Sequence, residues 1–343
     1  MASSAQTQSK SRQWVIIKVV VAILFLIVTT QLPVLEILLQ LLVKAPVFAT
    51  VFLGIFIEAV PFLLLGTLGS GFVEVFIDQE RIQRMIPRNT LLGVLVGSML
   101  GIIFPVCECG VVPLTRRLFS KGLPAAAGIA FLLAAPVVNP IAILSTAAAF
   151  GWGWMLVGRI GLSMLIAVAT AMIFSVVKSP ADVLLPSQWL HREAIPLPLH
   201  APAPVRSLRE KLRQMAVIAA DEFYEMGRFL ILGAALAAAM QALIPQQILL
   251  EVGRGPVTSV LVMLALAVIL SICSTVDAFV VLGFVSIFSP GAILAFLIFG
   301  PMVDIKTTLM YFSVLNKRSV VYLILFPFLM SLLAGLLINL LAA

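Results

Sequence analysis

The residues best able to do chemistry lie in two short stretches inside apolar runs. Cys107, Glu108 and Cys109 follow one another between a proline and a glycine, and the third cysteine of the chain, Cys273, lies far away in a second apolar run. Three thiols in one cavity would form a soft-ligand site suited to trivalent arsenic, Cu(I) or zinc. Cys107, Cys109 and Cys273 are therefore the predicted metal or metalloid ligands. The plain alternative is that these cysteines only fill apolar space.

Ionisable and polar side chains within apolar runs form a second set. A charge near the centre of a bilayer costs at least ~2.5–3.5 kcal/mol, so such groups usually pair or line a pathway. The predicted substrate contacts besides the cysteines are Glu108, Asn139 and Asp277. The predicted coupling or gating groups, which could carry protons, are Glu58, Glu225, Asp304 and Lys306. Structural alternatives stay open: the Asn139 amide could equally satisfy backbone freed by a helix break, and Asp304 and Lys306 could neutralise each other or Asp277.

The high hydrophobic content of the chain indicates that these residues belong to an integral membrane protein. Of 343 residues, 62% are hydrophobic and 11% are charged, whereas an average soluble domain has about 45–50% and 25%. The apolar runs are continuous, which predicts an all-α integral membrane protein rather than a barrel. No phosphate-binding glycine motif is found, so neither ATP hydrolysis nor a cofactor is expected. The net charge of +7 does not imply nucleic acid, because the basic residues lie mainly between apolar runs.

About nine spans are expected from the hydropathy. Each has close to, or more than, the ~20 residues that are needed to cross a bilayer. They are residues 14–32, 46–77, 90–106, 123–149, 152–177, 220–244, 257–272, 290–314 and 319–341. The predicted organisation is an N-terminal span (1–45), a first membrane repeat (46–177), a Pro-rich basic linker (178–219) and a second repeat (220–343).

Matches at a nearly constant offset predict that the membrane part is duplicated. Glu58 and Gly66 recur as Glu225 and Gly233, and a later proline–asparagine motif recurs with Asp304 in place of the asparagine. Repeats with interrupted helices are typical of transporters. A re-entrant turn at residues 107–110 would keep the following basic residues and the linker cytoplasmic. The two repeats would then be inverted, with the N-terminus also cytoplasmic.

Three motif blocks carry a resemblance to a known family. Residues 107–113, 121–140 and 300–306 resemble the YraQ-type predicted permeases, which include bacterial permeases that export trivalent organoarsenicals. The resemblance covers about residues 46–341 and implies a permease of the inner (plasma) membrane. It also implies that Cys107, Cys109 and Cys273 stand where the family would place thiols.

The leading hypothesis is a secondary-active permease, not an enzyme, that exports a thiophilic metal or metalloid species. Its expected partners are a small-molecule or ionic substrate, the lipid bilayer and coupling protons. Two alternatives stay open. One is a transporter or channel for a small anion bound at half-helix N-termini. The other is a membrane thiol-disulfide oxidoreductase that uses Cys107 and Cys109.

Overall fold

The chain is helical throughout its described part, as predicted. The computed structural model describes residues 34–85, 87, 89–175, 183–185, 207–243 and 255–342, and within them the only extended pairing is one bridge between Leu184 and Leu315. The chain divides into two compact units, Met1–Ala49 and Thr50–Ala343. The described part of the first unit is the beginning of one helix, and all features below belong to the second unit.

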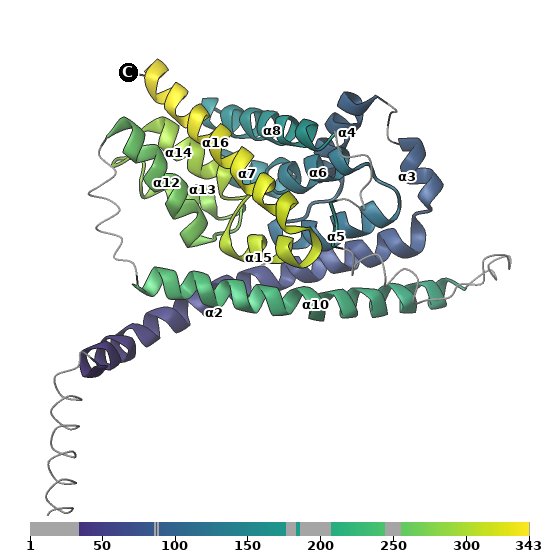
Figure 1. Cartoon of the computed structure of the whole chain (residues 1–343), viewed down its shortest axis with the longest axis horizontal. Helices are drawn as coiled ribbons and strands as arrows, with labels where there is room; N and C mark the ends of the chain where they lie inside the picture. Colours follow the sequence, from purple (N-terminus) through teal and green to yellow (C-terminus); the bar gives the residue numbers. More distant parts are fainter. Residues whose placement is uncertain are drawn as a thin grey trace, which may run out of the picture. The chain divides into compact units, whose positions relative to one another are not determined.

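Each half of the second unit contains runs of consecutive short helices together with long ones (Figure 1). They are α2 (Val34–Phe76), α3 (Gln79–Met85), α4 (Thr90–Ile103), α5 (Glu108–Ser120), α6 (Ala125–Val138), α7 (Pro140–Phe150), α8 (Trp154–Phe174), α10 (Leu208–Leu243), α12 (Pro256–Leu270), α13 (Asp277–Leu282), α14 (Pro290–Phe299), α15 (Ile305–Val314) and α16 (Lys317–Ala342).

Fewer helices are long enough to cross a membrane than the nine spans predicted. In the described residues these are α2, α8, α10 and α16, or five if the bent pair of α6 and α7 is one span. The shorter apolar helices α4, α12 and α14 have 14, 15 and 10 residues. At 1.5 Å per residue they fall short of the ~30 Å hydrocarbon layer. The predicted first span, residues 14–32, lies outside the described residues.

Local sequence explains where the helices break. Cys107 is the extended N-cap of α5, and Ser271 ends α12 in a left-handed conformation with φ 48°. The side chain of Asn139 accepts a hydrogen bond from the Ile141 amide, and that of Asp304 accepts one from the Thr307 amide. These caps satisfy the first free N–H groups of α7 and α15. The proline–asparagine motif that ends at Asn139 and its repeat that ends at Asp304 therefore each start a new helix.

Equivalent elements appear in the same order in the two halves of the membrane part. Each half begins with a long helix (α2 or α10), followed by a short apolar helix (α4 or α12) and a break that contains a cysteine. A buried helix comes next (α6 or α14), then a polar cap, and a long helix ends the half (α8 or α16). The helix α10 begins at Leu208 and so extends into the segment predicted as the linker 178–219; residues 176–182 and 186–206 lie outside the description.

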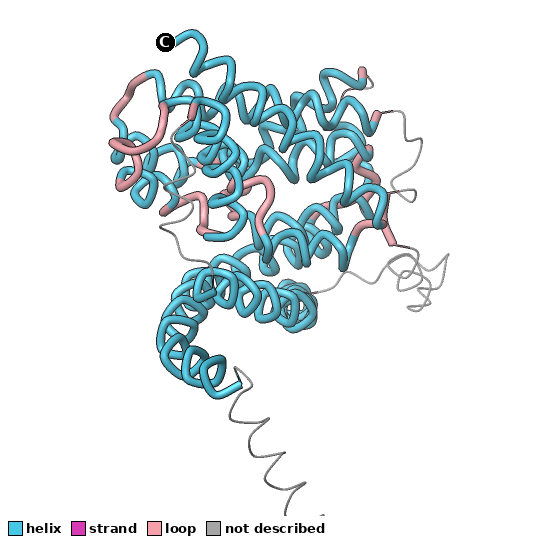
Figure 2. The backbone as a smooth tube through the Cα atoms, turned by 60° about the vertical axis from the view of Figure 1, so that its left-hand side comes forward, coloured by secondary structure: helices cyan, strands magenta, loops and turns pink. Residues whose placement is uncertain are grey.

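The two halves interlock through their short helices. Helix α5 of the first half packs against α15 of the second, and α13 of the second packs against α7 of the first. Every residue of α6 and nearly every residue of α14 is buried, so these two helices form the centre of the core. The breaks at residues 106–107, 271–274 and 301–304 consist almost entirely of buried residues, and Figure 2 draws several loop segments in pink among the helices. Irregular backbone is thus surrounded by protein, as a membrane interior requires.

Candidate functional site

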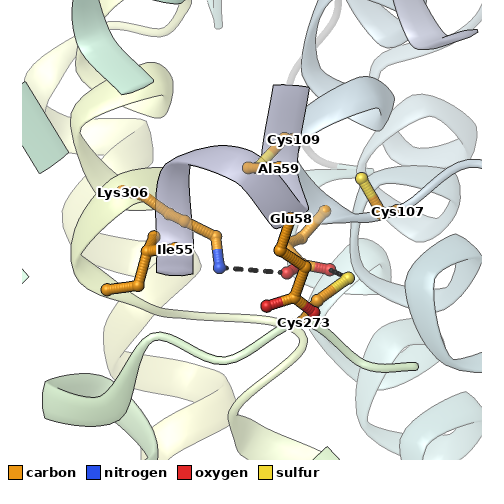
Figure 3. Close-up of a pocket in the computed structure, with 8 residues that line it drawn as sticks. Ile55, Glu58, Ala59, Cys107, Cys109, Cys273 and Lys306 are labelled. Carbon is orange, nitrogen blue, oxygen red and sulfur yellow. Dashed lines mark hydrogen bonds and ion pairs between the residues drawn. The ribbon is translucent and has the colours of Figure 1, made fainter. Parts of the chain in front are cut away.

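The two cysteine stretches meet at one small pocket in the second unit. Its lining residues are Ile55, Glu58, Ala59, Cys107, Glu108, Cys109, Cys273 and Lys306 (Figure 3). They come from α2, the start of α5, the break after α12 and the start of α15. The pocket leaves no room for a water-sized sphere. Residues from both halves of the chain therefore pack around one small, tightly filled space.

Three possible ligand atoms converge in this pocket. The sulfurs of Cys107 and Cys273 and a carboxylate oxygen of Glu108 all lie within 4.8 Å of one another. The Cys273 thiol donates a hydrogen bond to Glu108 Oε2 at 3.6 Å. The side chains are buried, with Cys107 and Glu108 each only 1% exposed. Two sulfurs and one carboxylate form a donor set that suits zinc or another borderline-to-soft species. We call these three residues the ligand cluster.

Cys109 lines the pocket but does not belong to the ligand cluster. It is as buried as Cys107, and the Cys107 thiol interacts with those of both Cys109 and Cys273. Cys107 is an extended N-cap, whereas Cys109 is already inside the helix, so their side chains leave the backbone in different directions. The prediction grouped three thiols; the structure groups two thiols and a carboxylate. All three cysteines are free.

A buried lysine connects the ligand cluster to a second carboxylate. Lys306 Nζ lies 3.2 Å from Glu108 Oε1 and 2.9 Å from Asp304 Oδ2. It also donates a hydrogen bond to the Ser271 carbonyl at 2.6 Å. Lys306 is 2% exposed and Asp304 is 1% exposed. The expected mutual neutralisation of Asp304 and Lys306 is therefore seen as an ion pair, and Glu108 joins it.

The two glutamates predicted as a repeat-related pair lie in different surroundings. Glu58 borders the pocket from α2, and its Oε1 atom is buried with no hydrogen-bond partner among the described residues. Glu225 lies outside the pocket, where its Oε2 accepts a hydrogen bond from Arg116 Nη1 at 2.8 Å. Glu58 thus offers an unused acceptor beside the ligand cluster, and Glu225 ties α10 to α5.

The opposite end of α5 carries a network of charges. Arg117 Nε donates to Glu222 Oε1 at 2.5 Å, and Arg117 and Lys121 lie 3.8 and 3.5 Å from the carboxylate of Glu74. These pairs hold the end of α5 between α2 and α10. The helix therefore has the ligand cluster at its first residues and an ionic anchor at its last ones.

Asp277 lies away from the pocket lining and pairs with an arginine that the sequence analysis did not single out. Arg159 Nη2 is 2.6 Å from Asp277 Oδ2, and Nη1 is 3.0 Å from Oδ1. The same guanidinium donates to Thr146 Oγ1 and to the Ser274 carbonyl. The signal that could have revealed Arg159 is its position as a lone charge in an apolar span, which requires a buried partner.

Asn139 forms hydrogen bonds with backbone groups freed by the helix break, which was one of the two roles predicted for it. Besides capping α7, its amide nitrogen donates to the Val106 carbonyl at 3.4 Å, next to Cys107. Its side chain is buried but does not line the pocket. It supports the broken backbone that carries the ligand cluster.

Comparisons with known proteins agree with the membrane-helical fold. Residues 44–340 match the model of the ArsP_1 family, described as predicted permeases. The chain is 43% identical over 276 residues to the UPF0718 protein YcgR of Bacillus subtilis, covering 80% of this chain and 91% of the relative. It is 25% identical over 120 residues to the UPF0718 protein YraQ of Escherichia coli, covering 35% of this chain and 34% of the relative. No solved structure matches significantly.

A further relative is named after an assembly. The chain is 36% identical over 267 residues to a protein of Streptococcus mutans described as a proposed subunit of a two-component membrane permease complex, covering 76% of this chain and 84% of the relative. The resemblance to YraQ-type permeases is thereby confirmed, and so is a multi-pass membrane protein of a transporter family. The family model spans nearly all of the described residues, and the chain belongs to the ArsP_1 family of predicted permeases.

Proposed function

We propose that this protein is a secondary-active permease that exports a thiophilic metal or metalloid species, such as a trivalent organoarsenical. The observation that carries the proposal is the ligand cluster, in which Cys107 and Glu108 from one half meet Cys273 from the other within 4.8 Å. A trivalent arsenical with one organic group needs two thiolates, and the cluster supplies two sulfurs. No catalytic step is required of the protein.

Alternating access follows if the two halves are inverted repeats. The matching order of helices supports this arrangement, and broken helices that meet near the bilayer midplane are where such transporters bind substrate. Residues of both halves line the pocket, which leaves no room for a water-sized sphere. A movement of one half against the other would open it to one side of the membrane at a time, and Glu58 is the group we propose for proton coupling.

The proposed topology places the protein in the plasma (inner) membrane, with the stretch around Cys107–Gly110 re-entrant rather than fully crossing. The N-terminus and the basic linker 178–219 are cytoplasmic in this arrangement, in agreement with the positive-inside rule. The name of the Streptococcus mutans relative supports a complex with a second membrane subunit as part of the proposal.

The charges of the pocket oppose an anionic substrate. Glu58 and Glu108 line it with a single cation, Lys306, which is shared between Glu108 and Asp304, so one lysine faces three carboxylates. An anion would meet uncompensated carboxylates at short range in a buried site, where charge repulsion is strong. The deep burial of all three thiols likewise gives a redox partner no access to them.

Transport by purified full-length protein in proteoliposomes tests the proposal. We expect accumulation of methylarsenite in wild-type vesicles, and its loss in Cys107→Ser and in Cys273→Ser, because each removes one of the two sulfurs of the ligand cluster. Cys109→Ser is the matched control, since it removes an equally buried thiol of the same helix start that lies outside the cluster. Equal uptake by all three variants would contradict the proposal.

A further inference from the structure

Two ion pairs join the halves of the chain at the end of α5 that lies away from the pocket. Arg116 Nη1 lies 2.8 Å from Glu225 Oε2, and Arg117 Nε lies 2.5 Å from Glu222 Oε1. Both arginines belong to α5 of the first half, and both glutamates belong to α10 of the second. We call these two contacts the inter-half pairs. Any movement that separates α5 from α10 must break them.

The two helices that carry the inter-half pairs also reach the pocket. Helix α5 begins with Glu108, a member of the ligand cluster. Helix α10 touches the pocket wall at Gly233, where an added Cβ would lie only 2.5 Å from the Cα of Lys306. The distance along α10 from Glu225 to Gly233 is about 12 Å, at 1.5 Å per residue. Separating the helices at the inter-half pairs would therefore move the walls of the pocket about two turns away.

The inter-half pairs are partly shielded from solvent. The side chains of Arg116 and Glu225 are 14% and 30% exposed, and that of Glu222 is 3% exposed. Partly buried pairs are screened much less than exposed ones, so these contacts can hold α5 and α10 together. Removing one partner leaves the other charge in a poorly solvated place, which favours any arrangement of the helices that admits water.

The second half carries no such charges at the matching positions. The offset that relates the two cysteines of the ligand cluster takes Arg116 and Arg117 to Leu282 and Gly283. If the halves are inverted repeats, matching positions lie toward opposite sides of the membrane. Ion pairs of this kind would then close one side only, and the positive-inside rule makes that side the cytoplasmic one.

Resting on the proposed function, we propose that the inter-half pairs are the cytoplasmic gate of the permease. In the structure both pairs are formed, and the pocket has no room for a water-sized sphere. When the pairs break, α5 and α10 part, and the cytoplasm gains access to the ligand cluster. The neighbouring pair of Lys121 and Glu74 is not part of this gate, because both residues belong to the first half.

Access to the thiols of the ligand cluster tests the gate. The reagent is MTSET, a small cationic methanethiosulfonate that does not cross membranes, and peptide mass spectrometry identifies which cysteine has reacted. In inverted vesicles, whose cytoplasmic face is outward, we expect Cys107 and Cys273 to react about tenfold faster in Arg116→Gln than in the wild type, which is the size of an ordinary coupling between two conformations. In right-side-out vesicles the variant should react like the wild type.

Exchanging the two charges of one pair separates the gate from a general loosening of the fold. Arg116→Glu should react faster still, because two carboxylates then face each other, and Arg116→Glu combined with Glu225→Arg should return to the wild-type rate. Lys121→Gln is the matched control: it removes an ion pair at the same end of α5 but within one half, so its rate should stay at the wild-type value. Thermal unfolding in detergent checks that each variant folds, and Glu225→Gln replaces Arg116→Gln, with the same expectation, if the latter does not.

The outcomes distinguish this inference from the proposed function. Wild-type rates in every variant, equal acceleration from both sides of the membrane, or no recovery in the charge exchange overturns the gate. The permease proposal has its own probe in phenylarsine oxide, a neutral arsenical whose arsenic forms two As–S bonds with two thiols while its oxygen leaves as water with both thiol protons. Loss of its binding in Cys107→Ser and in Cys273→Ser leaves the permease proposal intact even if the gate fails. Binding that survives both substitutions overturns the proposed function, whatever the rates of labelling.

Discussion

Arg159 and Asp277 show at the residue scale how the fold accommodates charge in an apolar interior. The arginine is 1% exposed and the aspartate 2% exposed, and the two form a bidentate pair with contacts of 2.6 and 3.0 Å. Arg159 belongs to α8 of the first half and Asp277 begins α13 of the second. The pair therefore joins the two halves at a place separate from the pocket.

Removing the arginine alone should strongly destabilise the protein. Arg159→Met leaves the Asp277 carboxylate buried without its cation, and we expect a loss of about 3–5 kcal/mol of stability. The double variant Arg159→Met with Asp277→Leu should recover most of it, because an apolar pair of similar volume has no charge to desolvate. Thermal unfolding in detergent measures the difference.

The control is an ion pair of the same kind on the surface. Arg84 and Glu80 in α3 are 3.4 Å apart, with side chains 81% and 82% exposed. Arg84→Met should change stability by less than about 1 kcal/mol, as exposed pairs contribute little. If the double variant in the core were as unstable as Arg159→Met, the charge explanation would be wrong.

At the scale of elements, α5 is held by a close contact with α2. A Cβ atom added to Gly66 would lie 2.2 Å from the Cα of Gly110, far below any real contact distance. Both partners are backbone, so no side chain can turn away. Gly110 follows Glu108 by two residues, and the position of the ligand cluster thus depends on two glycines that let the helices touch.

Substituting the α2 glycine should disturb the pocket. In Gly66→Ala the two backbones must separate, and we expect a loss of about 1–3 kcal/mol of stability together with weaker capture of phenylarsine oxide. Gly69→Ala is the control on the same helix, because a Cβ there meets nothing within 4 Å and alanine favours a helix by up to about 1 kcal/mol. Thermal unfolding and arsenical titration report both variants; equal behaviour would show that the contact has no bearing on the site.

For the whole molecule, the proposed topology sets the side of the membrane on which each loop lies. Gly153 precedes α8, whose other end leads toward the basic linker, and Ser207 precedes α10 at the end of that linker. With the linker cytoplasmic, Gly153 lies outside and Ser207 inside. Both residues are exposed, and the three native cysteines are buried and can stay in place.

Cysteine labelling in intact cells tests this topology. A membrane-impermeant maleimide added outside should label Gly153→Cys and leave Ser207→Cys unlabelled; after the cells are opened, it should label both. The wild-type protein, with only its buried thiols, should stay unlabelled and serves as the blank. Labelling of Ser207→Cys from outside would reverse the proposed orientation.

Much of the fold was predictable because its causes are local. Continuous apolar runs predict membrane helices, and prolines, glycines and polar caps mark where the helices break, as at Asn139 and Asp304. Fewer helices of spanning length are described than spans were predicted, because hydropathy does not register a helix that stops after 10 to 15 residues. A helix around residues 207–220 was expected as the end of the linker because its first turns are charged; in the structure it continues without a break to Leu243 as α10.

Composition, apolar runs and local motifs were enough to predict a helical membrane permease, its family, and the thiols and charges available for a site. The tertiary structure alone decided which of them meet: Glu108 lies between Cys273 and Lys306, Cys109 is outside the ligand cluster, and Asp277 pairs with Arg159. The physical reason is that the contacts of Glu108 and Asp277 join segments more than a hundred residues apart. The position of Cys109 depends instead on the direction in which its side chain leaves the first turn of α5. Such contacts follow from how short helices of the two halves pack, which no local pattern encodes.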